Sequence, residues 1–267
     1  MNKEGAIGVY DSGVGGLTVV RELFSQLPGE KIVYVGDTAH VPYGSRSEAE
    51  LVELTRRIIR FLLAKGAKII VSACNTTSSV AIPQLEKEFP VPLVDVIRPG
   101  ARGAVAATRN GKVGVIATEA TVRSGSYQRA IQTIEPSIEV YAQACPRLVP
   151  LVEKGTLQGP EVEEALREYL QPLQEKGIDT LVLGCTHYPF LQPVINALLG
   201  PGVAVVDPAR ETVAEAARLL REQGLIYADT SRYRAHEFYF TGPADSFEKI
   251  GRSFVQLRDV EVKKAEI

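Results

Sequence analysis

The sequence predicts an α/β fold of two pseudo-symmetric α/β domains with mostly parallel sheets and an active site in the cleft between them. Short apolar runs alternate with helix-length amphipathic segments along most of the 267 residues, a pattern typical of βα units with parallel strands. Two segments, 68–77 and 180–189, each place a cysteine and a polar turn after an apolar run. A second pair of similar segments, 8–12 and 114–118, lies at nearly the same offset. Two such pairs favour a duplicated α/β half.

The first half is expected to alternate strands and helices from its first residues. Its strands are expected at residues 6–10, 31–35 and 68–73. A helix is expected from about Leu17, after a glycine-rich turn. Ser47 and Glu50 have the spacing of a capping box for a second helix, and Gly66 suits its C-terminal end. A third helix is expected to begin near Thr77.

The second half repeats this alternation after a crossover marked by Pro92, Pro99 and Gly100. Its strands are expected at residues 112–116, 138–143, 181–183 and 203–206. Residues 160–176 have the pattern of a helix, and Pro189 suits the first position of the helix that follows.

The C-terminal tail is expected to return to the first half. It contains a predicted helix at 212–223 and a short aromatic strand at 237–240. The predicted domains are therefore 1–98 plus 208–267, and an inserted domain at 99–207.

Composition excludes several classes of protein. The net charge is −2, so no overall basic character points to nucleic acid or an anionic membrane. No apolar run approaches the length of a membrane span, and the N-terminus has no signal-peptide pattern. Three cysteines without a Cys-x-x-Cys pair are no disulfide framework. A reducing cytoplasm is the expected location.

Polar side chains follow the predicted strands, at the edge where parallel α/β sheets bind ligands. These candidates are Asp11, Ser12, Tyr43, Gly44, Cys74, Asn75, Thr76, Thr118, Thr121, Cys185, Thr186 and His187. Their hydroxyls, amides and nearby helix N-termini suit a small ligand with carboxylates. The same helix ends are expected to lower the pKa of each thiol.

Two thiols facing one small ligand suit proton transfer on opposite faces of a carbon. Inverting a stereocentre without redox chemistry requires a base on one face and an acid on the other. The reverse reaction exchanges these roles, so two residues of the same type fit it. Cys74 and Cys185 are the predicted pair, and His187 lies two residues from Cys185.

Other features favour plainer interpretations. Cys145 has no matching partner and is expected to be core packing. A zinc site would require Cys185, His187 and Cys74 without a fourth ligand, so no metal is expected. The turn at 11–16 lacks the Gly-x-Gly-x-x-Gly spacing of dinucleotide sites. No Gly-x-Ser-x-Gly elbow of a serine hydrolase is present.

Four segments resemble the cofactor-independent glutamate racemases of the aspartate/glutamate racemase superfamily. They are Asp11-Ser-Gly-Val-Gly-Gly-Leu-Thr, Gly36-Asp-Thr-Ala-His-Val-Pro-Tyr-Gly, Ala73-Cys-Asn-Thr-Thr and Gly184-Cys-Thr-His-Tyr-Pro, with a weaker match at 144–153. The resemblance covers nearly the whole chain, and the Thr-His-Tyr-Pro ending is similar to the glutamate branch. It implies interconversion of L- and D-glutamate without pyridoxal phosphate or metal, which supplies D-glutamate for peptidoglycan.

The resemblance also implies roles for individual residues. Cys74 would take the α-proton from the D-enantiomer and Cys185 from the L-enantiomer. Asp11 and His187 would tune Cys74 and Cys185 respectively, with Glu153 assisting at Cys185. The positions that match substrate-binding residues of the family are Asp11, Ser12, Tyr43, Gly44, Asn75, Thr76, Thr186 and His187. A homodimer is common in the similar family and is expected here.

Three alternatives remain open on the sequence. The same fold and thiols would also suit aspartate or a hydantoin as substrate. Cys74 and Cys185 would also suit a redox or regulatory protein with a switchable disulfide. A binding module with a protein partner is the third, whereas the absence of a basic patch argues against direct contact with DNA.

Overall fold

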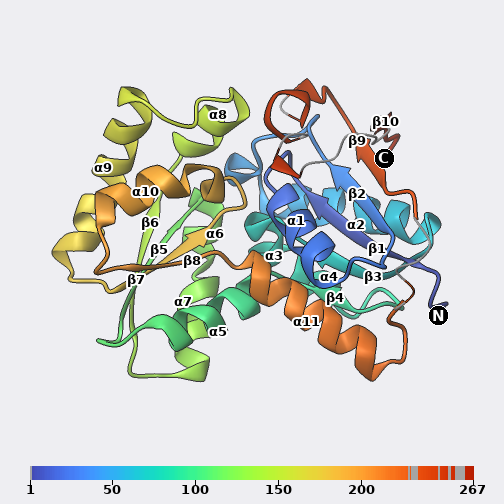
Figure 1. The fold of residues 1–267 in the computed structure, drawn as a ribbon, viewed down its shortest axis with the longest axis horizontal. Helices are drawn as coiled ribbons and strands as arrows, with labels where there is room; N and C mark the ends of the chain where they lie inside the picture. The colour runs from blue at the N-terminus through green and yellow to red at the C-terminus, as the bar shows by residue number, and fades with distance from the viewer. Residues whose placement is uncertain (1, 228, 230–233, 246, 252–253, 256–261) are drawn as a thin grey trace.

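The structure, a computed structural model, describes residues 2–227, 229, 234–245, 247–251, 254–255 and 262–267. Two sheets lie side by side, each with helices on both faces (Figure 1). The strands are β1 (Ala6–Asp11), β2 (Ile32–Gly36), β3 (Ala67–Ser72), β4 (Leu93–Val94), β5 (Lys112–Ala117), β6 (Glu139–Ala144), β7 (Thr180–Gly184), β8 (Ala204–Val206), β9 (Glu237–Phe240) and β10 (Val262–Lys264). All paired strands are parallel.

Helices connect the strands in the order that the alternation predicts. The α-helices are α1 (Leu17–Gln26), α2 (Glu48–Ala64), α3 (Asn75–Val80), α4 (Ile82–Leu85), α5 (Ile97–Ala107), α6 (Glu119–Ser124), α7 (Ser126–Ile134), α8 (Leu148–Glu153), α9 (Pro160–Glu175), α10 (Gln192–Leu199) and α11 (Ala209–Glu222). Shorter helical turns are η1 (Tyr43–Ser45), η2 (Tyr188–Leu191) and η3 (Phe247–Gly251).

The two sheets share one strand order, which confirms the predicted fold class. The first sheet has the order β10-β9-β2-β1-β3-β4 and the second β6-β5-β7-β8. The run β2-β1-β3-β4 therefore corresponds strand for strand to β6-β5-β7-β8. By this correspondence β3, which leads to Cys74, is equivalent to β7, which leads to Cys185. Two pairs of similar segments predicted pseudo-symmetric halves, and the structure shows that the halves share the same order of strands.

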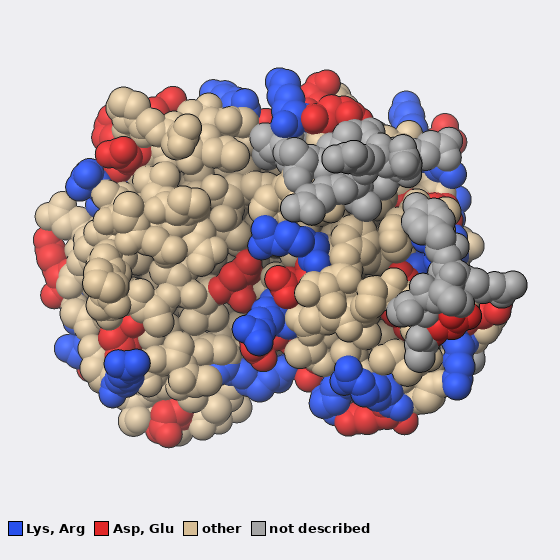
Figure 2. Space-filling view, in the orientation of Figure 1, with Lys and Arg blue, Asp and Glu red and all other residues tan. Residues whose placement is uncertain are grey.

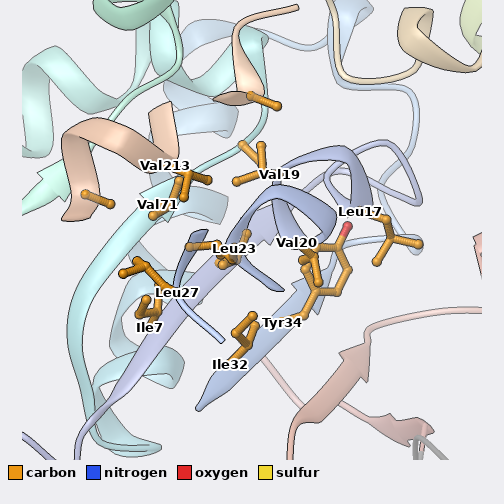
Figure 3. Close-up of a cluster of buried hydrophobic side chains, with 14 of the residues drawn as sticks. Ile7, Leu17, Val19, Val20, Leu23, Leu27, Ile32, Tyr34, Val71 and Val213 are labelled. Atoms are coloured by element: carbon orange, nitrogen blue, oxygen red, sulfur yellow. The ribbon is translucent and has the colours of Figure 1, made fainter. Parts of the chain in front are cut away.

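The first sheet is buried on both faces. Alternate side chains of a strand point to opposite faces, so Ile7 and Val9 of β1 pack with α1 and α11, whereas Tyr10 packs with α2. Figure 3 shows part of the hydrophobic cluster between the first sheet and helices α1 and α11, with Leu23 of α1 and Val213 of α11 close to the strands. In the second sheet, α5 and α7 cover one face, and α8, α9 and α10 cover the other.

The C-terminal tail extends the first sheet. β9 pairs with β2, and β10 pairs with β9. α11 packs against α1, and it lies below the first half in Figure 1. The boundaries 1–98 plus 208–267 and 99–207 stay a prediction.

Local elements follow the sequence with a few differences. Ser47 accepts the backbone N–H of Glu50 at the start of α2, which is one of the two hydrogen bonds of the predicted capping box, whereas the carboxylate of Glu50 pairs with Arg46. At the predicted crossover the chain passes from the first sheet, where β4 pairs with β3, to the second, where β5 pairs with β6 and β7. The connection contains the helix α5, which the sequence did not predict. Asp95 accepts the backbone N–H groups of Ile97 and Arg98 at its start, and Pro99 occupies its first turn, where a missing N–H costs nothing. Pro189 lies in η2 rather than in α10, which begins three residues later.

On the face in Figure 2, lysines and arginines are mixed with aspartates and glutamates, and no large patch carries charge of a single sign. In the part of the chain that the structure describes, every helix is too short or too polar to span a bilayer.

Candidate active site

A pocket between the two halves collects residues that follow strands of both sheets. It encloses a cavity of about 100 Å³ that opens to solvent. Its lining residues are Ser12, Pro42, Tyr43, Gly44, Ser45, Cys74, Asn75, Thr76, Thr118, Glu119, Cys145, Pro146, Val149, Pro150, Cys185, Thr186 and His187. Both predicted thiols therefore face one cavity.

Cys74 lies between β3 and α3 and is only 4% exposed. The pKa of its thiol is raised to about 12, chiefly by burial and then by the negative charge of Asp11, while hydrogen bonds from Thr77 act in the opposite direction. The expectation that the helix end lowers this pKa is therefore wrong. Desolvation of the thiolate and a nearby carboxylate outweigh the short helix α3.

Cys185 lies between β7 and η2 and is 5% exposed. Its sulfur is 3.7 Å from Nδ1 of His187. Nε2 of His187 is 2.6 Å from Oε1 of Glu153, at the end of α8. Burial lowers the pKa of His187, but hydrogen bonds with Cys185 and Glu153 and their negative charges raise it well above its usual value. The structure thus joins Cys185, His187 and Glu153 in one chain of contacts.

Asp11 is fully buried at the end of β1. Its Oδ2 accepts the backbone N–H of Gly13 at 3.0 Å, and its Oδ1 accepts the hydroxyl of Thr186 at 3.1 Å. It lies behind the pocket wall rather than among the lining residues. Asp11 therefore connects the turn after β1 to the turn that carries Cys185, and its charge acts on Cys74.

The glycine-rich turn after β1 packs directly against the second half. A Cβ at Gly13 would lie 2.4 Å from Oε1 of Glu153. A Cβ at Gly15 would lie 2.3 Å from Oγ1 of Thr186 and 2.7 Å from Nδ1 of His187. The absence of side chains at these glycines leaves space for Glu153, Thr186 and His187. The turn therefore packs against protein side chains and does not form a dinucleotide site.

The other predicted ligand-binding residues line the pocket: Ser12, Tyr43, Gly44, Asn75, Thr76, Thr186 and His187. Tyr43 is held by a short hydrogen bond from its hydroxyl to Asp37. Thr76 and Thr118 meet across the two halves, with 2.9 Å between their hydroxyl oxygens. Contact of these side chains with a ligand stays a prediction.

Some lining residues lie outside the predicted ligand-binding set. Thr118 follows β5, and its place at a strand end is a pattern that marks it as a candidate. Cys145 is buried, as expected for packing, but it also lines the pocket from the end of β6. By strand order it is equivalent to Asp37, which follows β2. Val149 and Pro150 of α8 lie in the segment 144–153 that weakly resembles the family, but no chemical group of theirs marks them as site residues.

The arrangement suits acid/base chemistry on a small polar molecule. Two buried free thiols lie at equivalent strand ends of two α/β halves, with hydroxyl and amide groups on the walls between them. Among the described residues, no three His, Cys, Asp or Glu side chains form a group that would hold a metal ion. Two acid/base groups, one from each half of the fold, suit an enzyme that exchanges protons on both faces of a carbon, the class that the resemblance to amino-acid racemases implies.

Comparison with known proteins leads to the same class. The sequence profile of the Asp/Glu/Hydantoin racemase family matches residues 7–216. The glutamate racemase of Desulforudis audaxviator (strain MP104C) is 48% identical over 258 residues, 94% of each chain. The chain belongs to the Asp/Glu/Hydantoin racemase family.

Solved structures agree over the full length. The glutamate racemase isoform RacE1 from Bacillus anthracis has a TM-score of 0.93 and 37% identity, covering 100% of this chain and 99% of that one. The glutamate racemase from Francisella tularensis subsp. tularensis SCHU S4, solved in complex with D-glutamate, has a TM-score of 0.91 and 35% identity, covering 99% and 98%. The redox and binding-module alternatives are not favoured.

Proposed function

We propose that this protein is a two-base glutamate racemase that interconverts L- and D-glutamate without a cofactor. One observation carries the proposal: two buried thiols from equivalent strand ends face one pocket. Similarity to glutamate racemases over nearly the full chain supports glutamate as the substrate. The proposed physiological role is the supply of D-glutamate for peptidoglycan.

In the proposed reaction a proton leaves one face of the α-carbon and another arrives on the opposite face. Starting from L-glutamate, the thiolate of Cys185 takes the α-proton, so the C–H bond breaks and an S–H bond forms. The electron pair stays on carbon until the thiol of Cys74 donates its proton to the other face. A thiol whose pKa is raised to about 12 is protonated at neutral pH, which suits Cys74 as the donor in this direction.

The neighbouring residues have supporting roles in the proposal. His187, hydrogen-bonded to Glu153, stabilises the thiolate of Cys185 as a nearby positive charge. Asp11 acts on Cys74 by charge and fixes Thr186 by a hydrogen bond. The α-proton is weakly acidic, so positioning and stabilisation of the carbanion account for much of the lowered barrier.

The polar lining residues would bind the substrate. Hydroxyl, amide and backbone groups of Ser12, Tyr43, Gly44, Asn75, Thr76 and Thr186 suit the two carboxylates and the amino group of glutamate. A cytoplasmic location agrees with three free thiols. A homodimer rests on the resemblance alone, and size-exclusion chromatography with light scattering tests it.

Racemisation in deuterated water tests the proposal. Purified enzyme without added cofactor should convert each glutamate enantiomer into the other, followed by circular dichroism, with solvent deuterium at the α-carbon of the product. A substrate panel containing aspartate and a hydantoin belongs to the same experiment. Turnover of aspartate but not glutamate, or product without deuterium, would overturn the proposal.

A further inference from the structure

Tyr127 of α7 reaches from the second half to a residue of the first. Its ring packs in the hydrophobic cluster between α5 and the second sheet. Its hydroxyl donates a hydrogen bond of 2.7 Å to Oδ1 of Asn75, which directly follows Cys74. Both side chains are only 3% exposed. The contact therefore joins the turn of one thiol to the core of the opposite half.

The same ring touches the turn of the other thiol. A Cβ at Gly184 would lie 3.1 Å from Cε2 of Tyr127, and Gly184 directly precedes Cys185. The Tyr127 side chain is thus in contact with the residue after one thiol and the residue before the other.

The hydroxyl of Tyr127 also determines the orientation of the Asn75 amide. Burial, and then the charges of Asp95 and Asp207, raise the pKa of Tyr127 well above its usual value, so the hydroxyl stays protonated. A buried hydroxyl donates to an acceptor, and the acceptor here is Oδ1. Nδ2, with two N–H groups, is left for other partners. Within the described ranges no protein acceptor binds Nδ2, and Asn75 lines the pocket.

We propose that Tyr127 is a positioning residue for glutamate: its hydrogen bond to Asn75 turns the amide N–H groups into the pocket, where they bind a carboxylate of the substrate. This inference rests on the proposed function. Without the Tyr127 hydroxyl, Oδ1 of Asn75 loses its hydrogen-bond donor, so the amide can turn and exchange the places of Oδ1 and Nδ2. An amide oxygen facing the substrate would repel the carboxylate that the N–H groups attract.

The test is Tyr127→Phe, which keeps the ring and removes the hydroxyl. KM should rise about tenfold for both enantiomers, equivalent to ~1.4 kcal/mol of binding, while kcat changes little, because carboxylate binding is common to ground and transition states. Because the enantiomers are equal in free energy, kcat/KM must fall equally in both directions. Tyr169→Phe, another buried tyrosine of the second half that does not line the pocket, is the matched control with unchanged KM.

A double-mutant cycle separates positioning from packing. In an Asn75→Ala background, Tyr127→Phe should have no further effect on KM. Asn75→Asp keeps an acceptor for Tyr127 but removes the N–H groups, so its KM should rise as well. An unchanged KM in Tyr127→Phe or Asn75→Asp, or additive effects in the cycle, would overturn the inference while the wild type still racemises glutamate. A wild type that does not racemise glutamate would overturn the proposed function instead.

Discussion

Glu153 contacts His187 and the first half of the molecule with one oxygen atom. Its Oε1 lies 2.6 Å from Nε2 of His187 and also accepts the backbone N–H of Val14 at 3.3 Å. Cys185 and Glu153 both raise the pKa of His187, and Glu153 is also a link between the two halves. The carboxylate of Glu153 thus both favours the protonated form of His187 and holds the glycine-rich turn against the second half.

The first prediction concerns the charge of this carboxylate. Glu153→Gln removes the negative charge that helps raise the pKa of His187, so that pKa should fall. The alkaline limb of the kcat/KM profile should move to lower pH, since this profile reports the ionising groups of the free enzyme. Steady-state racemisation between pH 6 and 10 measures it. Glu163→Gln, an exposed glutamate of α9 more than 3.5 Å from its arginine partner, is the control; an unmoved limb in Glu153→Gln contradicts the role of Glu153.

The second prediction is the pH dependence of stability. A histidine whose pKa is raised in the folded state stabilises the fold fully below its unfolded pKa of ~6.5. This contribution is lost as pH rises from there through the folded pKa. Urea unfolding should therefore show a steeper loss of stability above neutral pH for the wild type than for Glu153→Gln. Parallel curves would contradict the raised pKa of His187.

The third prediction concerns the reactivity of Cys74. With a pKa of about 12, its thiolate fraction at pH 8 is about 10⁻⁴, so alkylation by iodoacetamide should be slow. Asp11→Asn removes a negative charge that raises this pKa, so alkylation of Cys74 should become faster. Peptide mass spectrometry follows each cysteine separately. Cys145, whose pKa burial raises without a contribution from Asp11, is the internal control; an equal change at both thiols contradicts the charge effect.

The sequence predicts positions in this site better than it predicts contacts. An apolar run followed by a polar turn places Cys74 and Cys185 at strand ends, because that pattern is local. Two contacts join distant segments, and no local pattern reveals either of them. The family resemblance gave Glu153 an assisting role beside His187, whereas nothing in the sequence pointed to the contact of Tyr127 with Asn75.

The wrong expectations have physical causes of the same kind. The pKa of Cys74 is raised rather than lowered, because burial and the charge of Asp11 depend on the tertiary structure and outweigh the effect of the helix end. In the fold, Pro99 and Gly100 marked the crossover between the two sheets, but they gave no sign of the helix α5 within it. The cap by Asp95, which allows α5 to begin there, becomes visible only in the structure.

The fourth prediction concerns the close approach of the glycine-rich turn. In Gly15→Ala the new methyl group would lie 2.3 Å from Oγ1 of Thr186, so the turn or the residues around His187 have to move. Overpacking should cost about 1–3 kcal/mol of stability, and a displaced His187 should lower kcat/KM roughly a hundredfold. Thermal unfolding and racemisation assays measure both. Gly202→Ala, where a Cβ meets nothing within 4 Å, should match the wild type in both assays; a fully active Gly15→Ala contradicts the tight packing.

The fifth prediction separates the two thiols. Cys74→Ala and Cys185→Ala should each abolish racemisation while circular dichroism shows an intact fold. In deuterated water, Cys185→Ala should still exchange the α-proton of D-glutamate, because Cys74 is the base proposed for that enantiomer, and should leave L-glutamate unlabelled. Cys74→Ala should show the opposite preference, and Cys145→Ala should racemise both enantiomers. Near-normal racemisation by either single variant would exclude two bases, whereas exchange of both enantiomers by one variant would show that a single thiol reaches both faces of the α-carbon.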